Sequence, residues 1–184
     1  MASAFSHALV AYAIGRSHLW TVNAKRFWTL TVFCSIAPDL DVLAFIVGIP
    51  YEHVLGHRGL THSLLFACVF GVGVVRFGFP TVLLASTDGK RLVAHFSLVT
   101  ASHGFLDAFT NGGLGVAFFA PIENSRYFFP WTPVKVSPIG IFSFFSEWGI
   151  QVLANELCWI GIPVGVWLLG MGLVSGRKER HDRH

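Results

Sequence analysis

The sequence predicts an all-α integral membrane protein, a helical bundle with about three to five membrane-embedded helices and a His/Asp metal site. Hydrophobic residues make up 53% of the chain and charged residues only 12%, whereas soluble domains carry about 25% charged residues. The mean hydropathy is +0.61. His and Asp residues gather in short clusters inside apolar runs, where an ionised Asp costs roughly 2.5–3.5 kcal/mol. A divalent cation shared with imidazoles would offset that cost.

The length of the chain, 184 residues, suits one domain. We expect a single membrane-embedded domain over 1–174 and a polar basic tail over 175–184. The formal charge of +3 comes largely from this tail and from Arg16, Lys25 and Arg26. Basic residues that flank apolar runs set membrane topology, so we expect a multi-pass protein with both termini in the cytoplasm. No Lys/Arg stripe with interleaved aromatics occurs, so we expect no direct nucleic-acid binding.

The first half of the chain alternates between apolar and polar segments. Residues 3–14 are apolar but too short to span a bilayer, and a polar basic connection follows at 15–26. Residues 27–49 are long enough to span, but Pro38-Asp39-Leu40-Asp41 interrupts them. Proline removes a backbone donor, and broken helices in membranes often line a site. A His-rich polar loop follows at 50–62.

The second half of the chain contains the clearest membrane-spanning pattern. Residues 64–86 form a further spanning candidate, weakened by an Arg and a Pro, and residues 91–110 predict a helix. Residues 111–146 are rich in Gly, Pro and aromatics, which suits a membrane interface or the wall of a site. Residues 148–174 predict the clearest spanning helix.

His103 and Asp107 form the sharpest candidate metal motif. They are four residues apart, so on a helix they share one face and both can reach one ion. A structural His–Asp hydrogen bond is the alternative that this spacing allows.

Asp39 and Asp41 are the next candidate ligands. On a helix they point in different directions. Asp39 is the better ligand candidate and a candidate proton acceptor, although it follows Pro38 and could instead cap a helix. Asp41 could support a ligand or hold a second ion.

His57 and His62 bracket a short segment that contains Arg58. The imidazoles suit a metal, and Arg58 could grip an anionic oxygen. The alternative is an interfacial loop that reaches lipid headgroups. His7 becomes a candidate ligand only beside these other clusters.

Glu156 and Arg126 are the remaining candidate catalytic residues. Glu156 lies inside a predicted spanning helix, where a carboxylate is a functional candidate by default. It could be a ligand or a general base, or a buried partner of an Arg. Arg126 could clamp a phosphate or simply meet lipid headgroups.

Together these residues resemble the YdjM-like family of inner-membrane-associated metal-dependent hydrolases. The likeness covers nearly the whole chain, and His57-Arg58-Gly59-Leu60-Thr61-His62-Ser63 is its most specific element. It also includes Arg126-Tyr127-Phe128-Phe129-Pro130-Trp131. The family is also described as LexA-binding, which we interpret as a label for SOS-type gene control.

A weaker likeness is to the zinc-dependent phospholipase C and P1 nuclease fold. It implies that His7, Asp39, His103 and Asp107, with His57 or His62, surround zinc. The sequence departs from that fold because it has no His-x-x-x-Glu for a third zinc. We therefore expect one or two ions.

These observations predict a membrane-bound metal-dependent hydrolase with Zn2+, Mn2+ or Fe2+ as cofactor. Asp39 or Glu156 would accept a proton, and Arg58 and Arg126 would stabilise a phosphoryl oxyanion. The expected substrate is a phosphoester of a lipid or another amphipathic molecule. One alternative is a small oligomeric transporter or ion-binding protein that uses the same cluster. Another is a catalytically inactive, metal-stabilised membrane protein.

Overall fold

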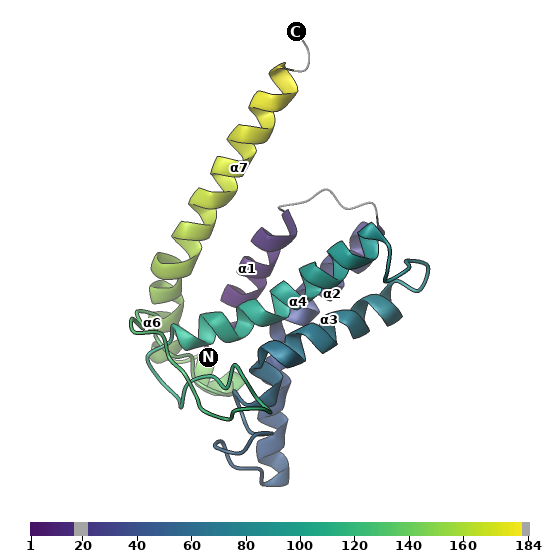
Figure 1. The fold of residues 1–184 in the computed structure, drawn as a ribbon. Coiled ribbons are helices and arrows are strands. Elements are labelled where there is room, and N and C mark those ends of the chain that lie inside the picture. The colour runs from purple at the N-terminus through teal and green to yellow at the C-terminus, as the bar shows by residue number, and fades with distance from the viewer. Residues whose placement is uncertain (17–21, 182–184) are drawn as a thin grey trace.

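The computed structural model describes residues 1–16 and 22–181 (Figure 1). These residues are helical or irregular, with two isolated β-bridges and no strand, so the all-α prediction is confirmed for them. The helices are α1 (Ala4–Arg16), α2 (Ala24–Ile36), η1 (Ala37–Val47), η2 (Leu60–His62), α3 (Leu64–Gly78), α4 (Thr87–Ala108), α5 (Ile141–Phe144), α6 (Glu147–Glu156), η3 (Leu157–Gly161) and α7 (Ile162–His181).

The first long apolar segment changes its helix type at the predicted interruption. The side chain of Asn23 accepts a hydrogen bond from Arg26 N and starts α2. After Ile36 the chain continues as the 3₁₀ helix η1, with Pro38 in its first turn, where a missing N–H costs little. The two helices together are 24 residues long with a mean hydropathy of 1.9, enough to span a membrane.

The helix α3 is shorter than the predicted 64–86 segment. Ser63 caps its start, because the Ser63 hydroxyl accepts from Phe66 N. The helix ends at Gly78, two residues before Pro80, because proline disfavours helical backbone in the residue before it. The remaining residues form a turn into α4, whose start is capped by Ser86.

The C-terminal helices form a second candidate span. The helices α6, η3 and α7 join over Glu147–Leu173 with a mean hydropathy of 1.7. Only this segment and Ala24–Val47 are long and apolar enough to span a membrane among the described residues. Further embedded helices stay a prediction. The helix α7 projects away from the other helices and continues to His181, into the predicted tail (Figure 1).

The helices α1 to α4 pack into a bundle with a divided interior. One end holds an apolar core that includes Phe27, Val75, Leu92 and Phe96. The other end, where α4 finishes and η1 lies, holds buried His and Asp side chains. The bundle therefore places a polar cluster at one end and closes the other with hydrophobic packing.

Candidate metal centre

The C-terminal half of α4 provides two of the predicted ligands. His103 and Asp107 are fully buried and lie one turn apart. The Nδ1 atom of His103 lies 2.7 Å from the carbonyl oxygen of Ser35. A carbonyl only accepts, so Nδ1 carries the proton and Nε2 has a free lone pair. That Nε2 lies 3.2 Å from Oδ1 of Asp39.

The 3₁₀ geometry of η1 separates Asp39 from Asp41. Successive residues rotate by about 120° in a 3₁₀ helix, so side chains two residues apart point in different directions. Asp39 therefore faces α4, while Asp41 faces the loop that leads to η2.

The loop before η2 brings His62 to the other side of Asp39 and Asp107. His62 Nε2 lies 3.5 Å from Oδ2 of Asp107 and 3.7 Å from Oδ1 of Asp39. Arg58 adopts a φ of 61°, an uncommon value for a residue with a side chain. Gly104 permits the approach of η2 to α4, because a Cβ atom there would lie 2.9 Å from the carbonyl oxygen of His62.

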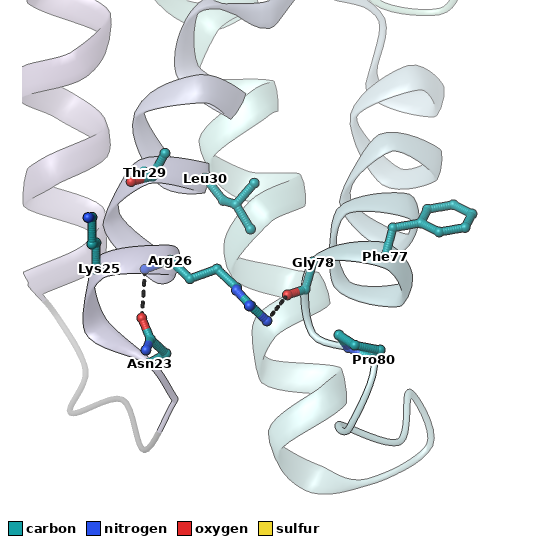
Figure 2. Close-up of a pocket in the computed structure, with 8 residues that line it drawn as sticks. All are labelled: Asn23, Lys25, Arg26, Thr29, Leu30, Phe77, Gly78 and Pro80. Carbon is teal, nitrogen blue, oxygen red and sulfur yellow. Dashed lines mark hydrogen bonds between the residues drawn. The ribbon is translucent and has the colours of Figure 1, made fainter.

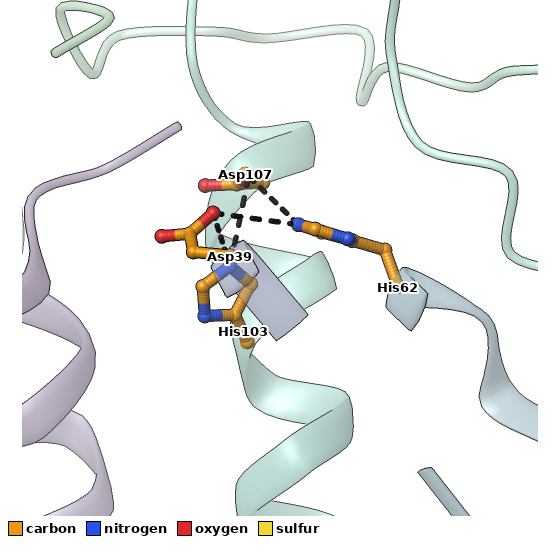
Figure 3. A group of neighbouring side chains, drawn as sticks. All are labelled: Asp39, His62, His103 and Asp107. Atoms are coloured by element: carbon orange, nitrogen blue, oxygen red, sulfur yellow. Dashed lines mark ion pairs between the residues drawn. The ribbon is translucent and has the colours of Figure 1, made fainter. Parts of the chain in front are cut away.

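Asp39, His62, His103 and Asp107 thus converge on one point (Figure 3). One ligand atom from each lies within 4.8 Å of all the others. These atoms, Asp39 Oδ1, His62 Nε2, His103 Nε2 and Asp107 Oδ2, are buried without a hydrogen-bond partner. Buried polar atoms nearly always have partners, so four that lack one and face each other fit a divalent cation.

The charges around this group also match a divalent cation. Three carboxylates lie close to His62, and they are those of Asp39, Asp41 and Asp107. One guanidinium, that of Arg58, pairs with Asp107. With neutral imidazoles, these four side chains carry two negative charges in excess, and the α-amino group of Met1, which also lies near Asp107, offsets one of them when it is protonated. Burial lowers the pKa of His62, but the interactions with the three neighbouring carboxylates outweigh it and raise this pKa to about 10. In the metal-free protein, a proton on His62 therefore offsets part of that charge.

Asp41 and His57 lie beside this group and bond to each other. His57 Nδ1 is 2.6 Å from Oδ1 of Asp41. The other oxygen, Oδ2, accepts from Arg58 N at 3.1 Å and from the Thr61 hydroxyl at 2.6 Å, and it lies 3.1 Å from His62 Nδ1. Asp41 therefore supports His62, and of the two candidate histidines the structure brings His62 into the four-residue group. Asp41, His57 and His62 could hold a second ion.

His7, on α1, covers another side of the group. Its ring stacks on that of His103, with centroids 3.7 Å apart and an interplanar angle of 10°. Its Nε2 lies 3.4 Å from Oδ1 of Asp107 and has no hydrogen-bond partner. Burial and the neighbouring His103 lower the pKa of His7 to about 4 against the attraction of Asp107, so His7 is neutral near pH 7. It remains a candidate additional ligand.

The two predicted phosphate-binding arginines hold loops together. The fully buried Arg58 donates to Gly112 O at 2.8 Å and to Thr110 Oγ1 at 3.0 Å, and its Nε lies 3.2 Å from Asp107 Oδ2. Arg126 donates to the carbonyl oxygens of His57 and Tyr51 at 2.9 and 2.8 Å. Both side chains thus bind protein groups, and their grip on a substrate anion stays a prediction.

Glu156 anchors the start of the chain. Its carboxylate accepts from Ser3 N, from the Ser3 hydroxyl and from the Ser6 hydroxyl. It is buried, but it is not one of the residues that converge around Asp107 among the described residues. The predicted alternative partners, arginines, do not pair with it there either.

Several contacts of this site could not be found from the sequence. Ser35 contributes only a backbone carbonyl, and Ala2 donates its backbone N–H to Asp107 Oδ1 at 2.7 Å. Nearly every residue carries the same backbone N–H and carbonyl groups, so the sequence does not show which of them bond to the site. Thr61 had a weak signal, because a hydroxyl beside a candidate ligand histidine can bond to a nearby carboxylate.

Comparisons with known proteins identify relatives of this chain among inner membrane proteins. The model of the family described as YdjM inner membrane protein matches residues 1–178. The chain is 35% identical over 174 residues to the inner membrane protein YbcI of Escherichia coli (strain K12), covering 93% of this chain and 96% of that protein. No solved structure matches the chain. A match over almost the whole length, with an inner membrane protein as relative, shows that this chain belongs to the YdjM inner membrane protein family.

Proposed function

We propose that this protein is a membrane-bound metal-dependent hydrolase that holds a divalent ion between Asp39, His62, His103 and Asp107. The observation that carries the proposal is the convergence of four buried ligand atoms that have no hydrogen-bond partner. Nitrogen and oxygen donors without thiolate suit Zn2+ best, with Mn2+ or Fe2+ as alternatives. An ion bound there would supply Lewis acidity to water and to the scissile group.

The exposure of Asp39 supports access to the site. Its side chain is 13% exposed, whereas those of His62, His103 and Asp107 are at 0%. Figure 3 shows its second carboxylate oxygen pointing away from the other three side chains. A substrate would therefore arrive at Asp39, whose outer oxygen can accept a proton. Because Asp39 belongs to a candidate membrane span, an amphipathic phosphoester is the substrate class that fits.

A catalytically inactive, metal-stabilised membrane protein is the second candidate function. A specific observation favours it: Arg58, Arg126 and Glu156 are all engaged with protein groups. Their presence in the sequence suggested catalysis, but their contacts are those of structural residues. A transporter is less consistent, because an apolar core fills the bundle beyond the His/Asp group.

Elemental analysis of the detergent-purified protein tests the metal centre. We expect about one zinc, manganese or iron ion per chain in the wild type and its loss in Asp107→Ala. Asp88→Ala is the matched control, because Asp88 is an exposed Asp of the same helix, and it should keep its metal. Equal metal content in all three proteins, or no metal even after reconstitution, would contradict the site.

A comparison of His62→Ala with His57→Ala assigns the loop ligand. We expect His62→Ala to lose metal and His57→Ala to retain it with weaker affinity, because His57 bonds to Asp41 and is not one of the four converging residues. The opposite order would place the ion in the group of Asp41, His57 and His62.

Hydrolysis assays separate the two candidate functions. Metal-loaded wild type should cleave chromogenic phosphodiesters or phosphomonoesters in mixed micelles, and His103→Ala should not. A protein with stoichiometric metal, a raised melting temperature and no turnover on phosphoesters would instead support the metal-stabilised structural role.

A further inference from the structure

We propose that a groove at the end of the bundle opposite the metal centre binds the headgroup of an anionic phospholipid. The groove has a volume of about 650 Å³ and lies between the start of α2 and the end of α3 (Figure 2). The residues that line it include Asn23, Lys25, Arg26, Leu30, Phe77 and Gly78. This site is separate from the proposed hydrolase centre and does not depend on it.

The topology of the bundle gathers basic residues at this end. The helices α1 and α3 end here, and α2 and α4 begin here. His7 near the start of α1 stacks on His103 near the end of α4, which places those two helix ends at the metal centre. Arg26 near the start of α2 bonds to Gly78 at the end of α3, which places these two helix ends at the groove. Exposed Arg and Lys side chains therefore lie around this end of the four-helix bundle. These residues are Arg16, Lys25, Arg26, Arg76, Lys90 and Arg91. Asp88 supplies a counter-charge to Arg91 at 3.9 Å.

Such a concentration of positive charge matches an anionic membrane surface. Basic residues favour the cytoplasmic side of a membrane protein, and the cytoplasmic leaflet carries anionic lipids. The metal centre would then lie towards the opposite leaflet. Ala2 would lie near that leaflet too, because its backbone N–H bonds to Asp107. This placement differs from the cytoplasmic N-terminus that the sequence predicts.

The two walls of the groove suit the two parts of a phospholipid. Lys25 and Arg26 are exposed at the start of α2, where the positive end of the helix dipole adds to their charge. Arg26 donates one N–H to Gly78 O at 3.1 Å, and other guanidinium donors remain for an anion. Leu30 and Phe77 form the apolar wall, and Phe77 is 83% exposed, as a residue in contact with acyl chains would be.

A neighbouring groove of about 520 Å³ provides an internal comparison. It shares Asn23 and Arg26 with the first groove, but it is also lined by Asp88 and lacks a second basic side chain. A carboxylate there repels a phosphate. The pair of cations without an acid favours the first groove as the headgroup site.

Native mass spectrometry of the full chain in detergent tests the proposal. Dioleoylphosphatidylglycerol and dioleoylphosphatidylcholine are titrated in parallel, and we expect the anionic lipid to bind the wild type about tenfold more tightly. Lys25→Gln should weaken binding of the anionic lipid about fivefold and leave the zwitterionic lipid unchanged. Because Lys25 is exposed, this change leaves the packing of α2 intact.

Lys90→Gln is the matched control, since Lys90 is an exposed Lys in the first turn of α4 and lies outside the groove. It should keep binding within about twofold of the wild type. An equal loss in both variants would show a general surface-charge effect and overturn the site, as would equal binding of the two lipids. Full competition by glycerol 3-phosphate, a headgroup without chains, would overturn the lipid in favour of a soluble anion.

Discussion

Asp41 and His62 form a carboxylate–imidazole pair in which Asp41 Oδ2 lies 3.1 Å from Nδ1 of His62. The opposite ring nitrogen, Nε2, faces Asp39 and Asp107. A carboxylate behind a metal-binding histidine fixes its tautomer and increases its basicity. Asp41 would therefore act on the ion through His62, even though its own oxygens bond to protein groups.

We expect Asp41→Asn to weaken metal binding without abolishing it. Loss of such a supporting carboxylate lowers metal affinity about 10–100-fold, and Asn keeps the shape of the side chain. Chelator competition measures the change. Asp88→Asn, an isosteric change at an exposed position, serves as the control. Unchanged affinity in Asp41→Asn would show that His62 does not need this partner.

Metal binding should release a proton above neutral pH. His62 has a pKa raised to about 10 in the metal-free protein, so an ion must displace its proton, whereas His7, with a pKa of about 4, has none to lose. Affinity should therefore rise about tenfold per pH unit between pH 7 and 9. Calorimetric titration in buffers of different ionisation enthalpy measures the proton count. A pH-independent affinity would exclude His62 as a ligand.

The same pKa predicts the pH dependence of the metal-free fold. A His whose pKa is raised on folding stabilises the protein fully below its unfolded pKa of 6.5, and this contribution disappears as pH rises through about 10. The melting temperature of chelated protein should therefore fall between pH 7 and pH 10. Metal-loaded protein should not show this fall, because the ion replaces the proton.

Gly104→Ala should damage the metal centre through one contact. The new Cβ would lie 2.9 Å from the carbonyl oxygen of His62 and would push η2 away from α4. We expect a destabilisation of about 1–3 kcal/mol and weaker metal binding. Gly73→Ala is the control, because no atom lies within 4 Å of its added Cβ, and it should gain up to about 1 kcal/mol in a helix. Equal behaviour of the two variants would contradict the close approach.

The sequence identified the His and Asp residues that gather in the candidate metal centre, but not how they are arranged. His103 and Asp107 could be paired because helical spacing places residues four apart on one face. The choice between His57 and His62 could not be made, because it depends on the unusual backbone of Arg58 and on the path of the loop. Glu156 was identified as a buried carboxylate, but its partners Ser3 and Ser6 are about 150 residues away, beyond any local pattern.

Glu156→Gln separates a structural role from a catalytic one. Glu156 accepts three hydrogen bonds from the segment that precedes and begins α1, and the amide should weaken them by about 1–2 kcal/mol in total. We expect a lower melting temperature with unchanged metal content and, where hydrolysis is found, a turnover reduced by less than about tenfold. The reverse result, normal stability with turnover lost by about a hundredfold or more, would make Glu156 the proton acceptor. We expect the structural result because both carboxylate oxygens of Glu156 already accept hydrogen bonds from Ser3 or Ser6. Of the two candidate proton acceptors, Glu156 and Asp39, only Asp39 has a carboxylate oxygen that points away from the other candidate ligands (Figure 3).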